Sequence, residues 1–169
     1  DSLNNQVTFN LGDFTNLETD AGDEFLIIGY NVIVRNDSGV ARGDTLVNSV
    51  QLREGGFDLG SPFSSSLTVV EPVLTVAKSD GGVTTADAGD LINYTLTVTA
   101  SNAANTTTAF ELLITDSVPA ALEIVGGVIS ISGLPGSSSV LRSTVSGQDI
   151  SVLVDRLKPG ETFQISYQA

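Results

Sequence analysis

Apolar and polar residues alternate along most of this chain. In the clearest stretch, the residues of one parity are all apolar: Ile92, Tyr94, Leu96 and Val98. The residues of the other parity are Asn93, Thr95, Thr97 and Thr99. A period of two is typical of a β-strand with one buried and one solvated face, and β-branched threonine suits a strand. Similar alternation predicts strands at Val7–Leu11, Leu26–Val34, Leu46–Leu52, Leu74–Lys78, Phe110–Asp116, Ile129–Ile131, Ile150–Val154 and Phe163–Tyr167.

Turn-forming residues separate these stretches. Gly, Asp, Asn, Ser and Pro cluster at 36–39, 54–56, 80–82, 87–90, 133–136 and 158–160, and such clusters favour tight turns. No segment has a helical period. Many short strands at this spacing predict an all-β chain built from immunoglobulin-like antiparallel β-sandwich repeats.

An internal repeat indicates how the chain is divided. Each copy is a strand, a glycine turn and a strand that ends in tyrosine; one runs from Val7 to Tyr30 and the other from Ile150 to Tyr167. The first copy continues into another strand pair, whereas the second stops two residues later. We therefore expect a chain that is cut out of phase with its folding unit.

A chain cut in this way is predicted to have two parts, each of which is an incomplete sandwich. Residues 1–70 are expected to be the C-terminal portion of one β-sandwich repeat, and residues 71–169 the N-terminal and middle portion of the next, with Pro72 marking the join. About four strands cannot cover both faces of a core, and open strand edges pair with other strands. The missing strands would come from a neighbouring repeat, another molecule or the second part. The alternative is one irregular sandwich in which all strands share a core.

Composition excludes several classes of function. The formal net charge of −13 disfavours binding to nucleic acid or an anionic membrane, and no apolar run reaches the length of a membrane span. The chain has no Cys and no His, so thiol nucleophiles, imidazole proton shuttles and the usual zinc sites are not available. Because it begins at Asp1 without a signal pattern, we interpret it as a mature segment or an excerpt.

The acidic residues make carboxylate chemistry and calcium binding weaker candidate functions. Clusters occur at Asp20–Glu24 and Asp87–Asp90, but neither has the spacing of an EF-hand. Because aspartate is common in turns, solvated turns explain both clusters better than Ca²⁺ does. We expect no cofactor and no enzymatic activity.

Several strings resemble the tandem immunoglobulin-like, isopeptide-forming repeats of giant bacterial cell-surface proteins. They are Glu71–Asp80, Ala88–Thr99 and Leu113–Leu122, with Asn5–Asp13 and Thr45–Val50 resembling the back half of such a repeat. Ala121 stands where that family usually has glycine. The resemblance implies an extracellular, repetitive, structural or adhesive protein of the bacterial surface.

Three polar residues share the parity of apolar neighbours. Lys78 follows Leu74 and Val76, Asn48 lies between Leu46 and Val50, and Asp116 follows Leu112 and Ile114; each is therefore predicted to point at a core. Lysine, asparagine and a carboxylic acid are the components of a self-forming isopeptide bond. Burial would lower the pKa of the lysine and raise that of the acid, so that a neutral amine attacks the asparagine carbonyl. Alternatively, Lys78 extends to water and Asp116 accepts bonds from turn amides.

The predicted division of the chain at residues 70–71 places these three candidates in different parts. Asn48 belongs to the first part and Lys78 with Asp116 to the second, so each would find its partner in a neighbouring repeat. If Asn48 of one copy met Lys78 of another, a covalent head-to-tail polymer would result.

The function that follows is an extracellular structural repeat, a spacer or filament segment whose partners are neighbouring copies. The alternative is an adhesin module that binds a glycan or protein through its end loops. Aromatic residues make up only 6% of the chain, and Tyr30, Tyr94 and Tyr167 are predicted to face the core, which leaves few for ligand binding. A carboxylate hydrolase ranks last, because no acidic pair has a recognisable spacing.

Overall fold

The computed structural model describes residues 6–13, 15, 17, 19–23 and 25–169. The chain divides into two units, one that ends at Val34 and one that begins at Arg35. The join predicted at residues 70–71 lies inside the second unit and stays a prediction.

The described residues of the first unit form no strand. The strands predicted at Val7–Leu11 and Leu26–Val34 are therefore wrong for this chain. A strand exists only when its backbone groups pair with a neighbour, and alternation in sequence supplies no neighbour. Tyr30, predicted to face a core, is about half exposed and lies against the ring of Phe9, with centroids 5.9 Å apart.

The second unit opens with two small antiparallel sheets. β1 (Thr45–Val50) pairs with β4 (Phe63–Thr68), and β2 (Arg53–Glu54) pairs with β3 (Phe57–Asp58) between them. The β1–β4 register places Leu46 opposite Leu67 and Val50 opposite Phe63. Residues directly opposite in an antiparallel pair point to the same face. One face of this pair, hereafter its apolar face, therefore carries these four apolar side chains with Asn48 and Ser65 between them.

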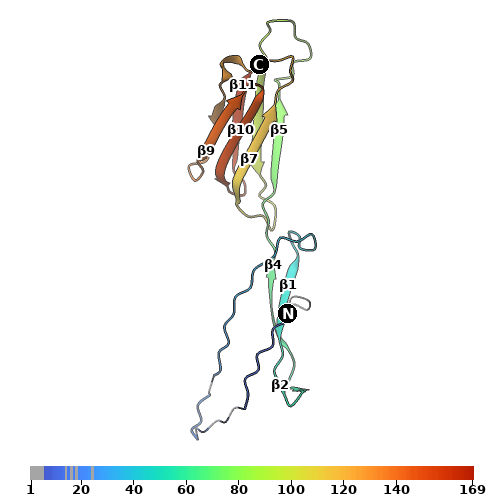
Figure 1. Cartoon of the computed structure of the whole chain (residues 1–169), viewed down its shortest axis with the longest axis vertical. Helices are drawn as coiled ribbons and strands as arrows, with labels where there is room; N and C mark the ends of the chain where they lie inside the picture. The colour runs from blue at the N-terminus through green and yellow to red at the C-terminus, as the bar shows by residue number, and fades with distance from the viewer. Residues whose placement is uncertain (1–5, 14, 16, 18, 24) are drawn as a thin grey trace. The chain divides into compact units, whose positions relative to one another are not determined.

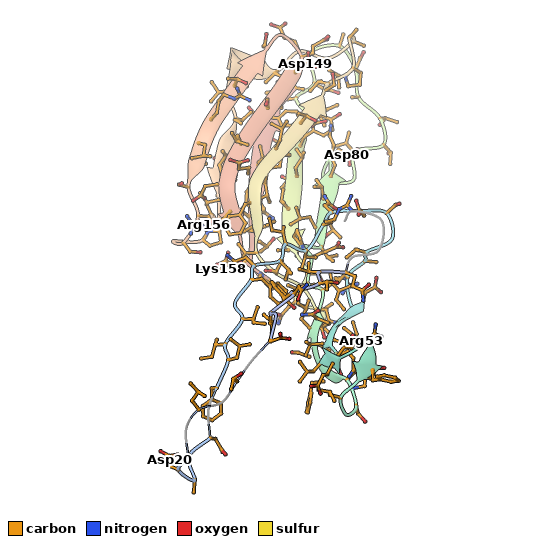
Figure 2. The ribbon with its side chains drawn as sticks, turned by 60° about the horizontal axis from the view of Figure 1, so that its bottom comes forward. Asp20, Arg53, Asp80, Asp149, Arg156 and Lys158 are labelled. Carbon is orange, nitrogen blue, oxygen red and sulfur yellow. The ribbon has the colours of Figure 1, made fainter. Side chains whose placement is uncertain are left out.

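Residues 74–168 form two larger sheets in a β-sandwich-like arrangement (Figure 1). One sheet has the order β5 (Leu74–Ser79), β6 (Asn93–Ala100), β11 (Thr162–Gln168) and β8 (Ser130–Ser132). The other has the order β7 (Ala109–Ser117), β10 (Asp149–Leu157) and β9 (Val140–Ser146). A short 3₁₀ turn, η1 (Val125–Gly127), precedes β8. Asp149 begins β10, whereas Arg156 and Lys158 lie at its other end (Figure 2).

All pairings between these named strands are antiparallel, so the all-β prediction is confirmed. The described residues contain no α-helix. Nor do they include a helix with the length and apolar character of a membrane crossing.

The core lies between the two larger sheets and follows the alternation of the sequence. β6 contributes Leu96 and Val98, β11 contributes Phe163 and Ile165, and the facing sheet contributes mainly Leu112, Ile114, Ile150, Val152 and Val154. Each of these side chains is buried. Burying a large apolar side chain contributes about 1.5–3 kcal/mol, so this two-sided layer is the main source of stability of the sandwich.

One parity prediction fails on β7. Phe110 shares the parity of Leu112 and Ile114, yet it is 66% exposed, and the buried residue is Ala109. The backbone of Glu111 takes a positive φ of 53°, which reverses the side-chain alternation at that point. Phe110 consequently faces outward, where its ring lies 6.0 Å from the guanidinium of Arg156.

The two sides of the sandwich are closed to different degrees. Beside β8, the connection that follows β7 buries Val118 and Ile124 against the core. At the other side, β5 and β7 are both edge strands, and β7 pairs with β10 alone among the strands of the described residues. The register aligns Leu74 and Val76 with buried residues of β6, yet both side chains are exposed. This side, defined by the inward face of β5 and the unpaired side of β7, is hereafter the open side.

Candidate functional site

An ion pair joins the two sheets at the open side. Lys78 on β5 donates to both carboxylate oxygens of Asp116 on β7, with Nζ–O distances of 2.8 Å. The structure therefore brings together two of the three residues that parity singled out. Asp116 is not explained by turn bonding alone, because its carboxylate accepts a bond from the facing sheet.

Tyr167 completes this cluster from the core side. Its hydroxyl donates to Asp116 Oδ2 at 2.6 Å, and its ring stacks on Tyr94 with centroids 5.2 Å apart. The ammonium of Lys78 lies 4.9 Å from the centroid of the Tyr94 ring and 5.7 Å from that of Tyr167. These are distances at which an aromatic face attracts a cation. The sequence placed Tyr167 at the core but did not indicate its bond to Asp116.

The electrostatics of the cluster favour the charged pair. Burial acts most strongly and would lower the pKa of Lys78, but the hydrogen bonds and charges of Asp116 and Tyr167 offset it and raise that pKa. Burial likewise would raise the pKa of Asp116, whereas Lys78 and Tyr167 lower it. For Tyr167, burial first and then the Asp116 carboxylate raise the pKa. The pKa directions predicted for an isopeptide-forming lysine and acid are thus reversed in this structure.

Interactions within the cluster explain this reversal. The hydrogen bonds and charges that Lys78, Asp116 and Tyr167 exchange together outweigh burial, although burial is the largest single contribution to the pKa of Lys78 and of Asp116. The Lys78 side chain is 37% exposed and that of Asp116 is 12% exposed. Parity correctly placed Lys78 on the inward face of β5, but that face is not enclosed. Removing water from the pair would strengthen the burial contribution and favour the neutral amine and acid.

Asn48 lies on β1 opposite Ser65, in the sheet formed by β1 and β4. It shares a face with Leu46 and Val50, but its side chain is exposed, so the prediction that it points at a core is wrong for this chain. The described contacts of the Lys78 and Asp116 side chains are with each other, Tyr94 and Tyr167. The three isopeptide candidates therefore occupy two different surfaces of the chain.

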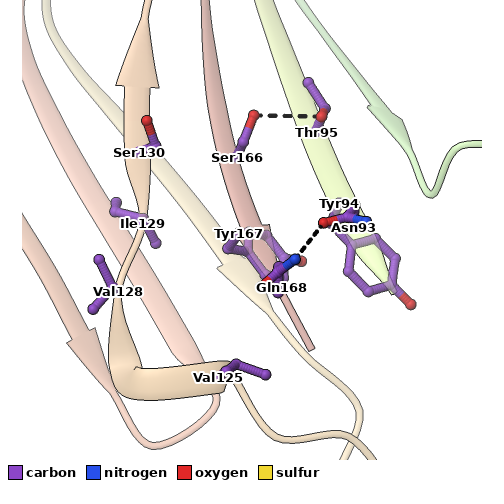
Figure 3. Close-up of a pocket in the computed structure, with 10 residues that line it drawn as sticks. All are labelled: Asn93, Tyr94, Thr95, Val125, Val128, Ile129, Ser130, Ser166, Tyr167 and Gln168. Atoms are coloured by element: carbon purple, nitrogen blue, oxygen red, sulfur yellow. Dashed lines mark hydrogen bonds between the residues drawn. The ribbon is translucent and has the colours of Figure 1, made fainter. Parts of the chain in front are cut away.

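A pocket of about 480 Å³ adjoins the stacked tyrosines (Figure 3). The side chains of Tyr94, Tyr167 and Gln168 border it together with residues of η1 and β8. Gln168 donates to Asn93 Oδ1 at 2.8 Å across β11 and β6. Of the residues that line it, Tyr167 also belongs to the cluster of Lys78 and Asp116.

In the acidic turns, aspartate side chains accept hydrogen bonds from nearby backbone amides. Asp20 accepts from the amide of Gly22, and Asp90 accepts from the amide of Asp87, both at 2.7 Å. Glu24, also part of the predicted cluster, lies outside the described residues. Among the residues that the structure does describe, no group of three or more acidic side chains is placed to hold a metal ion.

Searches of protein-family models, of curated proteins and of solved structures find no match to this chain.

Proposed function

We propose that this chain is an extracellular structural repeat of the bacterial surface, a spacer or filament segment that stacks head-to-tail with neighbouring copies. Its sandwich would be of the immunoglobulin type, cut out of phase with the folding unit. The proposal rests on the repeat in the sequence, on the strings that resemble tandem surface repeats, and on the geometry of the open side.

The proposal depends mainly on one observation: residues that share a face of one sheet are buried to very different extents. Val76 on β5 lies opposite Val98 on β6, and the two share one face of the sheet. Val98 is buried, whereas Val76 is 55% exposed. An apolar sheet face gains stability only where a second layer covers it. A neighbouring copy in a stacked array would supply that layer.

A staple between copies belongs to this proposal. The amine of Lys78 would attack Cγ of Asn48 from a neighbouring copy, forming a C–N bond as the bond to the Asn48 amide nitrogen breaks. Asp116 would carry a proton from the amine to the departing nitrogen, which leaves as ammonia. This chemistry needs a neutral lysine, so we expect it only after a neighbour has excluded water from the ion pair.

The test uses proteins with one, two and three copies of the chain joined in series. A spacer made of stacked repeats should lengthen by a constant increment per copy in small-angle scattering, and its melting temperature should rise, because each internal copy gains a neighbour. A maximum dimension or a melting temperature that does not change with copy number would refute the proposal. Binding of the single copy to a glycan array would instead favour the adhesin alternative.

A further inference from the structure

The open side has the chemistry of an acceptor for an added β-strand. β7 pairs with β10 on one side, and no described strand pairs with the other, so its remaining backbone groups face outward. Next to that edge, Leu74 and Val76 of β5 point inward from the facing sheet but remain exposed. A strand added beside β7 would both pair its backbone and cover these two side chains.

The β1–β4 pair has the complementary chemistry. Its apolar face carries Leu46 and Val50 from β1, with Leu67 and Phe63 opposite them on β4, on either side of the polar pair Asn48–Ser65. Of the four apolar side chains, Val50, Phe63 and Leu67 are exposed. Its other face is polar apart from Val47, because β4 contributes two serines and a threonine there. A two-stranded sheet is at best marginally stable alone, so this pair needs a second layer.

The repeat indicates that these two surfaces belong together. In the first repeat copy, the segment that ends in Tyr30, which forms no strand here, is followed along the chain by β1 and β4. Its counterpart in the second copy is β11, which ends next to Tyr167 and lies in the sandwich whose side is open. The element that the repeat calls for after β11 is therefore a sheet of the β1–β4 type.

We propose that the β1–β4 pair of one copy adds to β7 of a second copy and packs its apolar face on Leu74 and Val76. This inference rests on the proposed stacking function and names the two surfaces that meet. The interface is heterologous, because each copy gives one surface and receives on the other. Interfaces of this kind build open chains, or rings where the rotation closes, rather than two-fold dimers.

A second copy, rather than the same chain, is the donor. Arg42, just before β1, donates to the carbonyl of Ala104 at 2.7 Å, and the backbone of Glu71, just after β4, bonds to Asn105 and Thr107. These bonds attach both ends of the β1–β4 segment to the turn between β6 and β7. The segment would have to break them to fold back on its own β7.

The experiment compares two blocked variants of the full chain with matched controls. Phe63→Glu places a charge on the donor face, and Phe57→Glu is its control, since both phenylalanines are 78% exposed. Val76→Glu blocks the acceptor, and Leu141→Glu on β9 is its control, since both are 55% exposed. All four positions are exposed, so the substitutions should leave the fold intact, which circular dichroism verifies.

Sedimentation velocity over a range of concentrations gives the result. The unaltered chain and both controls should self-associate. Each blocked variant should need a concentration roughly ten or more times higher to associate to the same extent. Mixing the two blocked variants should restore association, but only to one-to-one pairs, because Phe63→Glu keeps its acceptor and Val76→Glu keeps its donor. An unaltered chain that stays monomeric, blocked variants that associate normally, or a mixture that stays monomeric would each overturn the inference. If serial copies lengthen while separate copies stay monomeric, the spacer function stands and only this docking fails.

Discussion

Tyr167 on β11 and Asp116 on β7 are joined by a 2.6 Å hydrogen bond that links the two sheets of the sandwich. The phenol donates to the same oxygen that Lys78 contacts at 2.8 Å, so one carboxylate holds three strands, β5, β7 and β11. This bond ties the core to the open side, where the rest of β5 is uncovered.

Removing the phenol hydroxyl should weaken the sandwich. Tyr167→Phe deletes a bond to a charged acceptor, which we expect to lower the free energy of unfolding by about 1.5–3 kcal/mol. Tyr94→Phe keeps the ring pair and the Tyr167–Asp116 bond and should change stability by about 0.5 kcal/mol or less. Urea unfolding of both variants gives the comparison; equal losses would mean that the hydroxyl of Tyr167 does not support the cluster.

The ion pair should contribute stability over a defined range of pH. The pKa of Asp116 is lowered on folding, so its contribution is present above the ordinary value of about 4 and is lost as pH falls through the folded value. The pKa values of Lys78 and Tyr167 are raised, so their contributions are present below pH of about 10 and are lost as pH rises through the folded values.

A double-mutant cycle of Lys78→Met and Asp116→Asn, measured by chemical denaturation, isolates this coupling. Because Lys78 is more than one-third exposed, solvent screens the pair, and we expect a coupling of about 1 kcal/mol or less at neutral pH. The coupling should disappear as pH falls through the lowered pKa of Asp116. A coupling that persists in strong acid would contradict the assignment of the pair.

Substitution by glycine should stabilise the sandwich at Glu111 and destabilise it elsewhere on β7. A left-handed conformation costs an ordinary residue about 1–2 kcal/mol, and glycine adopts it readily. Glu111→Gly, with φ of 53°, is therefore expected to stabilise the sandwich by about 0.5 kcal/mol. Thr115→Gly on the same strand should destabilise it by about 0.5–1 kcal/mol. Thermal unfolding that ranks the two variants the other way would contradict the observed backbone.

The all-β class and the parity of the central strands could be predicted from the sequence. β6 and β11 have neighbours on both sides and a facing layer, so alternation alone decides which residues are buried; Leu96 and Ile165 follow it. Phe110 does not follow the alternation, because the positive φ of the next residue, Glu111, reverses it. The sequence gives no sign of this reversal, since the residue there is not Asn, Asp or Gly.

The environment of the site could not be predicted in the same way. Parity placed Lys78 and Asp116 on facing surfaces, but it does not indicate what covers them. The inward side of β5 is open to solvent, and the hydrogen bonds and charges within the cluster, which together outweigh burial, set the direction of both pKa shifts. The hydroxyl of Tyr167 belongs to the site because β7 and β11 face each other, and that relationship arises from the packing of distant segments.

The proposed staple should change the mass of the chain. If Lys78 of one copy joins Asn48 of another, intact mass spectrometry of the serial proteins under denaturing conditions should show a loss of one ammonia for every junction. Lys78→Ala and Asn48→Ala should each abolish the loss, while Lys158→Ala, at the far end of β10, should retain it. A serial protein with its full calculated mass would exclude the staple and leave non-covalent stacking unaffected.

Hydrogen–deuterium exchange of β7 tests most directly whether another copy closes the open side. In dilute solution, the amides of β7 on the side away from β10 should exchange quickly. They should become protected as concentration rises, in parallel with the sedimenting mass, while peptides from the central strand β10 keep the same protection throughout. Exchange of β7 that stays fast at every concentration of the separate chain, and also in the serial proteins, would contradict the account.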